Sequence, residues 1–112
     1  MGNLRWFKMN PAAWLCHPKL SKCSPGARGI FLDIYCLIRG DPKLEKLGIT
    51  GELKPLSKFL RCSQGDLLDA LLALTDHGII ECKRVCPPGG MFDKDYVYTI
   101  KIKIKFAENG GA

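Results

Sequence analysis

The feature that most constrains the fold of this chain is a pair of helical patterns followed by two strand patterns. Residues 55–61 mix apolar and polar residues over the length of a short helix. After a tight turn, residues 64–77 carry leucines at helical spacing, which predicts a second helix with one buried stripe. Residues 79–85 and 96–106 have the composition and alternation of strands, and a Pro/Gly turn joins them. The order is therefore helix, turn, helix and β-hairpin.

Local signals mark both ends of the second of these helices. Ser63 and Asp66 fit the pattern in which a serine hydroxyl accepts a backbone N–H and an acid lies at the positive end of the helix dipole. Gly78 stands where a left-handed residue commonly ends a helix. The predicted buried stripe comprises Leu67, Leu68, Leu71, Leu72 and Leu74.

Residues 56–84, LSKFLRCSQGDLLDALLALTDHGIIECKR, resemble the second helix, turn, third helix and first wing strand of winged helix-turn-helix domains. Among these they are most similar to the N-terminal DNA-binding domains of phage and plasmid replication proteins. The resemblance implies an α+β fold with a three-helix core and a small antiparallel sheet that includes the wing hairpin. The matching positions are Leu56, Phe59 and Leu60 in the core of the second helix and Leu71, Leu74, Gly78 and Ile79 at the end of the third.

An earlier segment supplies the first helix of this core. Ser24-Pro25 is a good helix opening and Gly40 ends the apolar pattern. Gly26 and Gly29 lower the intrinsic stability of the helix, so we expect them to permit close packing against a neighbour. The residues at core-facing spacing are Ala27, Ile30, Phe31, Ile34, Leu37 and Ile38.

Two further segments are predicted to join the sheet. Residues 50–53 are the candidate for a short strand between the first and second helices. Residues 4–9 mix aromatic and basic side chains in a strand-like way. Because the segment 96–106 is longer than 79–85 can pair, we expect its second half to pair with residues 4–9 as an N-terminal edge strand.

The length and composition indicate one domain over residues 1–106, followed by a disordered tail over 107–112. No apolar run approaches the roughly 18 residues of a membrane span, and the first residues lack a signal-peptide pattern. The sequence therefore predicts a cytoplasmic protein with no membrane partner. The formal net charge of +6 favours a polyanionic partner.

The candidate binding residues are basic side chains outside the third helix. That helix contains no Lys or Arg and three aspartates, and only Gln64 near its start is suited to reading adenine. The lysines that alternate with isoleucines over 100–105 either contact phosphates or form a solvated sheet face that blocks aggregation. The predicted nucleic-acid-binding residues are Lys58, Arg61, Gln64, Lys83, Arg84, Lys94, Lys101 and Lys103.

No pattern of catalytic or metal-binding residues stands out. The six cysteines lack the paired spacing of zinc sites, and without a signal peptide we expect free thiols rather than a disulfide framework. His17 and His77 lie far apart in sequence with no nucleophile in a recognisable motif. Gly89-Gly90 lacks the flanking residues of a phosphate loop. The sequence predicts no enzyme, metal, cofactor or small-molecule substrate.

Two functions remain open. The resemblance implies a DNA-binding module of a phage or plasmid-type replication initiator or regulatory protein, which contacts double-stranded DNA mainly through phosphates. The alternative is a protein–protein interaction or dimerisation module, with a second copy or a replication protein as partner. The acidic third helix favours this alternative, as do the apolar Met91 and Phe92 in the wing.

Overall fold

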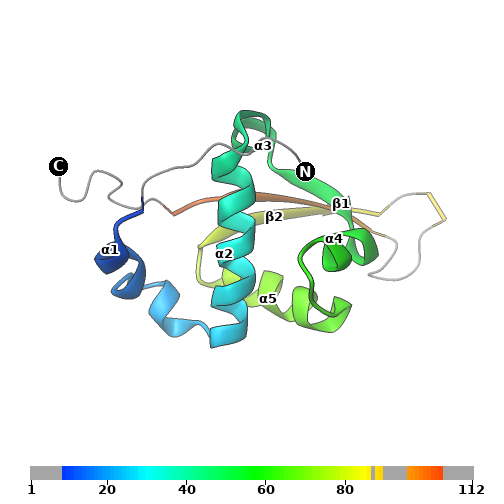
Figure 1. The fold of residues 1–112 in the computed structure, drawn as a ribbon. Coiled ribbons are helices and arrows are strands. Elements are labelled where there is room, and N and C mark those ends of the chain that lie inside the picture. Colours follow the sequence, from blue (N-terminus) through cyan, green and yellow to red (C-terminus); the bar gives the residue numbers. More distant parts are fainter. Residues whose placement is uncertain (1–8, 87, 90–95, 105–112) are drawn as a thin grey trace.

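The computed structural model describes residues 9–86, 88–89 and 96–104. Within them the chain forms five α-helices, a 3-10 turn and a three-stranded antiparallel sheet, so the fold is α+β (Figure 1). None of the described helices has the length and hydropathy needed to cross a membrane. The predicted tail over 107–112 lies outside the described residues. The elements are α1 (Pro11–Leu15), η1 (Leu20–Lys22), α2 (Pro25–Gly40), α3 (Pro42–Leu47), β1 (Ile49–Glu52), α4 (Leu53–Phe59), α5 (Gln64–Asp76), β2 (Ile80–Val85) and β3 (Val97–Ile102).

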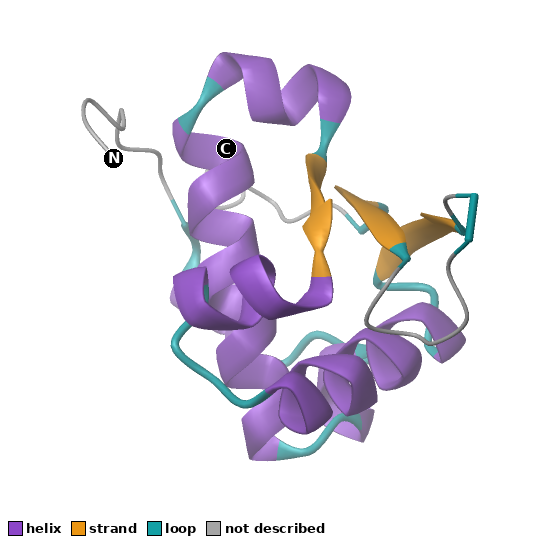
Figure 2. Cartoon of the chain, turned by 90° about the vertical axis from the view of Figure 1, so that its right-hand side faces the viewer, coloured by secondary structure: helices purple, strands orange, loops and turns teal. Residues whose placement is uncertain are grey.

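The sheet is built around β3, which pairs antiparallel with both other strands. At Ile100 the partners are Ile49 of β1 on one side and Cys82 of β2 on the other. β1 confirms the predicted first strand, one residue earlier than expected. The helices α2, α4 and α5 each contact the sheet. Figure 2 shows the chain after a rotation of 90° about the vertical axis of Figure 1.

The last strand is shorter than the sequence predicts. It covers Val97–Ile102 instead of residues 96–106. Beyond its end, the N–H groups of Lys103 and Ile104 both donate to the Ile79 carbonyl oxygen, at 3.0 and 3.4 Å. The reason is that β2 starts immediately after Ile79, so no further ladder is available for β3 to follow.

The N-terminal edge strand predicted over residues 4–9 lies outside the described residues except for Met9, which belongs to no strand. The edge of β3 that faces away from β2 is occupied by β1 from Val97 to Ile100. The two hairpin strands have six residues each. The described part of β3 is therefore no longer than β2, and the predicted pairing with residues 4–9 falls on residues outside the described ranges.

Three helices begin with the same local device, a capping side chain followed by proline. The Asn10 side chain accepts from the N–H of Ala12 at 3.0 Å and starts α1. Ser24 caps α2 in the same way, as predicted, and Asp41 caps α3. Proline suits the first helical position because its missing N–H would have no partner there.

The ends of α5 follow the prediction. The Ser63 hydroxyl oxygen accepts from the Asp66 N–H at 3.0 Å. At the other end Gly78 has a φ of +70°, and the next N–H, that of Ile79, donates to the Leu74 carbonyl at 2.9 Å. The Gly78 N–H also donates to Thr75, which completes a Schellman motif. This motif sends the chain directly into β2.

One hydrophobic core joins the helices to the inner face of the sheet. Phe31 of α2 is fully buried, and its ring stacks on Trp14 with 5.8 Å between centroids. The predicted helix stripes are confirmed at most positions. Their buried members are Ala27, Phe31, Ile34, Leu37 and Ile38 in α2 and Leu67, Leu71 and Leu74 in α5.

Three expectations about packing are wrong. Phe59, assigned to the core by the resemblance, is 50% exposed, because α4 is short and buries the side that carries Leu53 and Leu56. Leu72 is 57% exposed on the outer side of α5. A Cβ atom added at Gly26 or at Gly29 would meet nothing within 4 Å, so neither glycine permits a close approach of another element.

Candidate nucleic-acid interface

The structure brings three predicted residues together at the turn between α4 and α5. Lys58 lies in the last turn of α4, Arg61 in the turn, and Gln64 is the first residue of α5. All three side chains are exposed. Two cations therefore adjoin the N-terminal end of a 13-residue helix, where the backbone dipole also favours an anion.

Arg61 has an unusual backbone conformation for a residue with a side chain. Its φ is +58°, and its N–H donates to Lys58 at 3.2 Å. The N–H of Cys62 donates to Ser57 at 3.0 Å. This is the same Schellman motif that ends α5, with arginine in the place that glycine normally takes. An arginine that occupies this position is consistent with a role for its side chain, because the conformation costs energy.

Lys83 and Arg84, both predicted to bind nucleic acid, lie on opposite faces of the hairpin. Neighbouring strand residues point to opposite faces, and Arg84 pairs with Tyr98, whose ring is buried in the core. Arg84 therefore lies on the helix side of the sheet, where its guanidinium is 5.1 Å from the Tyr96 ring centroid. Lys83 lies on the outer side.

The outer side of the sheet carries balanced charge. Lys101 is exposed and stands directly opposite Glu81 in the register. Lys83 Nζ lies 3.6 Å from the carboxylate of the same Glu81. Lys103 is exposed beyond the end of β3, and Lys94 lies outside the described residues, as do Met91 and Phe92. Lys83 and Lys101, the lysines of the described strands, therefore both lie near Glu81. This arrangement is expected of a solvated sheet face, one of the two alternatives that the sequence left open.

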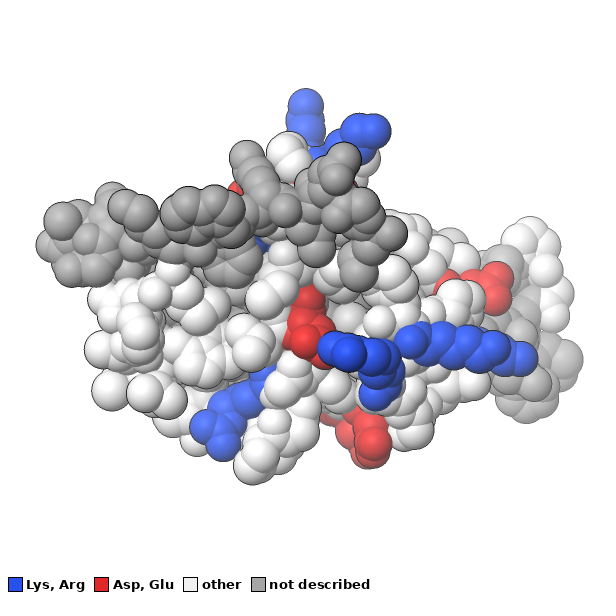
Figure 3. All heavy atoms as spheres, viewed as in Figure 1, with Lys and Arg blue, Asp and Glu red and all other residues white. Residues whose placement is uncertain are grey.

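The exposed charged residues of α5 are all acidic. Asp66, Asp69 and Asp76 are all exposed, and no Lys or Arg occurs between Gln64 and Asp76. On the face shown in Figure 3, basic atoms form separate groups at the top, centre and lower left, with acidic atoms between them. Basic and acidic side chains are therefore mixed on this face rather than gathered into one continuous basic surface.

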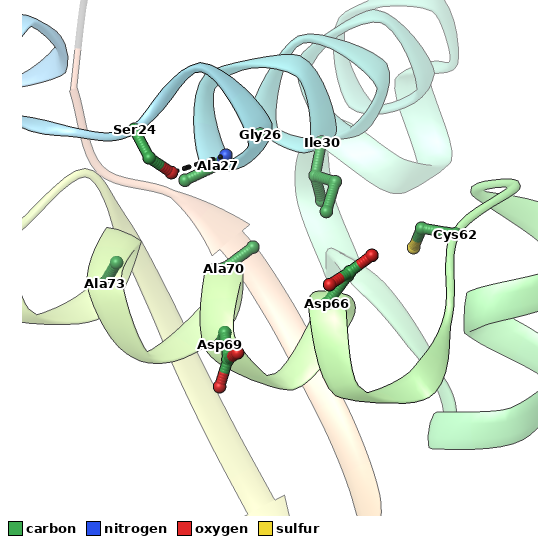
Figure 4. A pocket seen from close by; sticks show the side chains of 9 residues that line it. All are labelled: Ser24, Gly26, Ala27, Ile30, Cys62, Asp66, Asp69, Ala70 and Ala73. Carbon is green, nitrogen blue, oxygen red and sulfur yellow. Dashed lines mark hydrogen bonds between the residues drawn. The ribbon is translucent and has the colours of Figure 1, made fainter.

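A groove between α2 and α5 is a feature that the sequence did not indicate. It has a volume of about 570 Å³ and lies beside the start of α5 (Figure 4). Small residues on helices carry no distinctive sequence signal, so only the packing of the two helices reveals it. Its lining comprises Ser24, Gly26, Ala27, Ile30, Cys62, Asp66, Asp69, Ala70 and Ala73.

The cysteines and histidines form no recognisable reactive centre. No three His, Cys, Asp or Glu side chains gather as a metal site in the part of the chain that the structure describes. His17 Nδ1 accepts from the Lys19 N–H at 3.2 Å, and His77 is the C-cap residue of α5. Burial raises the pKa of four thiols, which makes them poor nucleophiles at neutral pH. These are Cys23, Cys36, Cys62 and Cys82.

Comparison with known proteins finds no family model, curated protein or solved structure that matches this chain.

Proposed function

We propose that this chain is a winged-helix domain that binds double-stranded DNA through its phosphates. Apart from the short elements α1, η1 and α3, the order is α2, β1, α4, α5, β2, β3, and the sheet order is β1-β3-β2. Both support this assignment, because winged-helix domains arrange their helices and strands in this way. The resemblance to phage and plasmid replication proteins makes DNA at a replication origin or a regulatory site the proposed target. Fold alone does not establish function, so the binding residues carry the rest of the proposal.

The observation that carries the proposal is the exposure of Lys58 and Arg61 beside the N-terminal end of α5. In a helix-turn-helix, the N-terminal part of the second helix approaches the bases while its surroundings contact the backbone. Gln64 is the residue placed to reach a base edge. Because α5 carries three exposed aspartates, with Asp66 already in its first turn, the proposed binding has weak sequence preference and depends on phosphate contacts made by Lys58 and Arg61.

The test is a fluorescence-anisotropy titration of a labelled 20-base-pair duplex at two salt concentrations. We expect micromolar binding at low salt that weakens steeply as the salt concentration rises. The slope of the logarithm of the affinity against the logarithm of the salt concentration is expected to be about −0.9 for each phosphate contacted. The double variant Lys58→Glu and Arg61→Glu is expected to lower the affinity at least about tenfold and to reduce the salt slope by about two contacts.

The matched control is the double variant Lys43→Glu and Lys46→Glu in α3. It changes the net charge equally, both lysines are exposed, and α3 lies at the opposite end of the molecule from α5 (Figure 1). We expect this control to lower the DNA affinity only about twofold, because it changes the long-range electrostatic field of the protein without removing a phosphate contact. An equal loss for both double variants, or no binding by the native protein at low salt, would show the proposal to be wrong.

The two faces of the hairpin lead to a second prediction. Arg84→Glu is expected to weaken DNA binding about tenfold, because Arg84 lies on the helix side of the sheet with the α4–α5 turn. Lys83→Glu, one residue away, is expected to have an effect of about twofold, since Lys83 lies on the outer side beside Glu81. The same titration measures both, and a larger effect from Lys83 would place the duplex on the outer face.

The outer side of α5 favours a second candidate function, the binding of another protein. Leu72 is 57% exposed and lies between Asp69 and Asp76 along one face of the helix. This spacing of three and four residues puts an apolar side chain between two acids on one side of the helix. The two carboxylates repel phosphates, and the acidic and apolar side chains together suit a protein surface that carries basic and apolar residues.

A further inference from the structure

The groove between α2 and α5 combines an apolar floor with acidic edges. Its floor comes from small or partly buried side chains of both helices, among them Ala27, Ile30 and Ala70. A side chain added at Gly26 would project into open space. Small residues let the backbone of a bound segment approach closely, and a half-buried Ile30 offers apolar surface that a partner could cover.

The charged residues that line the groove all have the same sign. Asp66 and Asp69 are exposed, and no Lys or Arg lines the groove. In Figure 4 the Asp66 side chain extends toward the space between Ile30 and Cys62, whereas Asp69 points away from α2. The pKa of the Cys62 thiol is raised by burial first and then by Asp66 and Asp33. A negative field therefore reaches this end of the groove.

We propose that this groove is a docking site for a cationic amphipathic helix of another protein. Charge complementarity selects this occupant: the chain has a formal net charge of +6, yet this groove presents two carboxylates and an apolar floor. An apolar face of the partner covers Ile30 and the alanines while its lysines reach Asp66 and Asp69, as in helix-in-groove recognition. The groove itself offers a phosphate no cation, because no Lys or Arg lines it.

Two glycines of α2 provide a matched pair of variants. Gly26 and Gly29 are both exposed, both lie in the helix, and neither has an atom within 4 Å of an added Cβ. Only Gly26 lines the groove. Gly26→Leu fills the groove, whereas Gly29→Leu adds the same side chain outside it. Leucine is a better helix former than glycine, so both variants are expected to fold.

The probe is a fluorescein-labelled 14-residue helical peptide of leucine and lysine, followed by anisotropy. We expect binding in the micromolar range, weakened at least about tenfold by Gly26→Leu and less than about twofold by Gly29→Leu. Asp69→Lys is likewise expected to weaken binding more than Asp76→Lys, since Asp76 is an exposed acid of the same helix outside the groove.

Several results would overturn the inference. They are no binding of the lysine peptide, equal binding of a peptide with glutamates in place of its lysines, and equal losses in Gly26→Leu and Gly29→Leu. The duplex titration of the Gly26→Leu protein separates this inference from the proposed DNA binding. Its DNA affinity is expected to stay unchanged, because none of Lys58, Arg61 and Arg84 lines the groove. Either function can therefore fail without the other.

Discussion

Replacing Phe31 by alanine is expected to lower the free energy of unfolding by about 3–5 kcal/mol, the usual range for a large aromatic in a core. The side chain is 0% exposed and its ring stacks on Trp14 and contacts Tyr35, each with 5.8 Å between ring centroids. Its removal opens a cavity at the point where α1 packs on α2 and takes away both aromatic contacts. Urea denaturation followed by circular dichroism measures the change.

The chain contains a control of the same residue type. Phe59→Ala removes an identical side chain that is 50% exposed at the end of α4. We expect a loss of less than about 1.5 kcal/mol, in proportion to the apolar area that this side chain buries. If Phe59→Ala were as destabilising as Phe31→Ala, the assignment of Phe59 to the surface would be incorrect, and the expectation from the resemblance would hold instead.

A second large loss of stability, about 3 kcal/mol or more, is expected for Gly48→Ala. Gly48 has φ +83° and ψ 175°, a combination that residues with a Cβ avoid. An added Cβ would also lie 2.6 Å from the Ile100 carbonyl oxygen and 2.8 Å from Lys101 Cγ. Because the carbonyl belongs to the backbone of β3, the central strand, relief of the clash requires β1 and β3 to move apart.

Gly78→Ala provides the comparison for Gly48→Ala. Gly78 also has a positive φ, +70°, but the nearest atom to an added Cβ is Lys19 Nζ at 3.4 Å, the far end of a flexible side chain. We expect a loss of about 1–2 kcal/mol, the cost of the left-handed conformation alone. Urea denaturation measures both variants. Equal losses of stability in Gly48→Ala and Gly78→Ala would mean that the clash of the added Cβ with the backbone of β3 costs nothing at Gly48.

The sequence by itself determined the features that depend on neighbouring residues. The caps at Ser24 and Ser63 and the left-handed Gly78 were predicted and are confirmed. The buried stripes of α2 and α5 are confirmed at most of their predicted positions, with Leu72 as an exception. Each depends on groups within about one helical turn, so the interaction that stabilises it is visible in the local sequence. The alternation of β3 is equally local, and Ile100 is buried while Lys101 is exposed.

The candidate interface was only partly predictable. Lys58, Arg61 and Gln64 are close in sequence, so their proximity at the α4–α5 turn followed from the helix-turn-helix pattern. The separation of Lys83 from Arg84 required knowledge of which face of the hairpin meets the helices. That choice depends on how β2 leaves the end of α5, which no single segment encodes.

Only the tertiary structure decided which surfaces meet. It placed β1 on the open edge of β3, turned Phe59 and Leu72 to solvent, and left a groove where α2 crosses α5. It also gave Gly48 its role, since the residue that excludes a side chain there is Ile100, far along the chain. Burial and contact are decided by the summed packing of distant elements, whereas caps and alternation are decided by the backbone within a few residues.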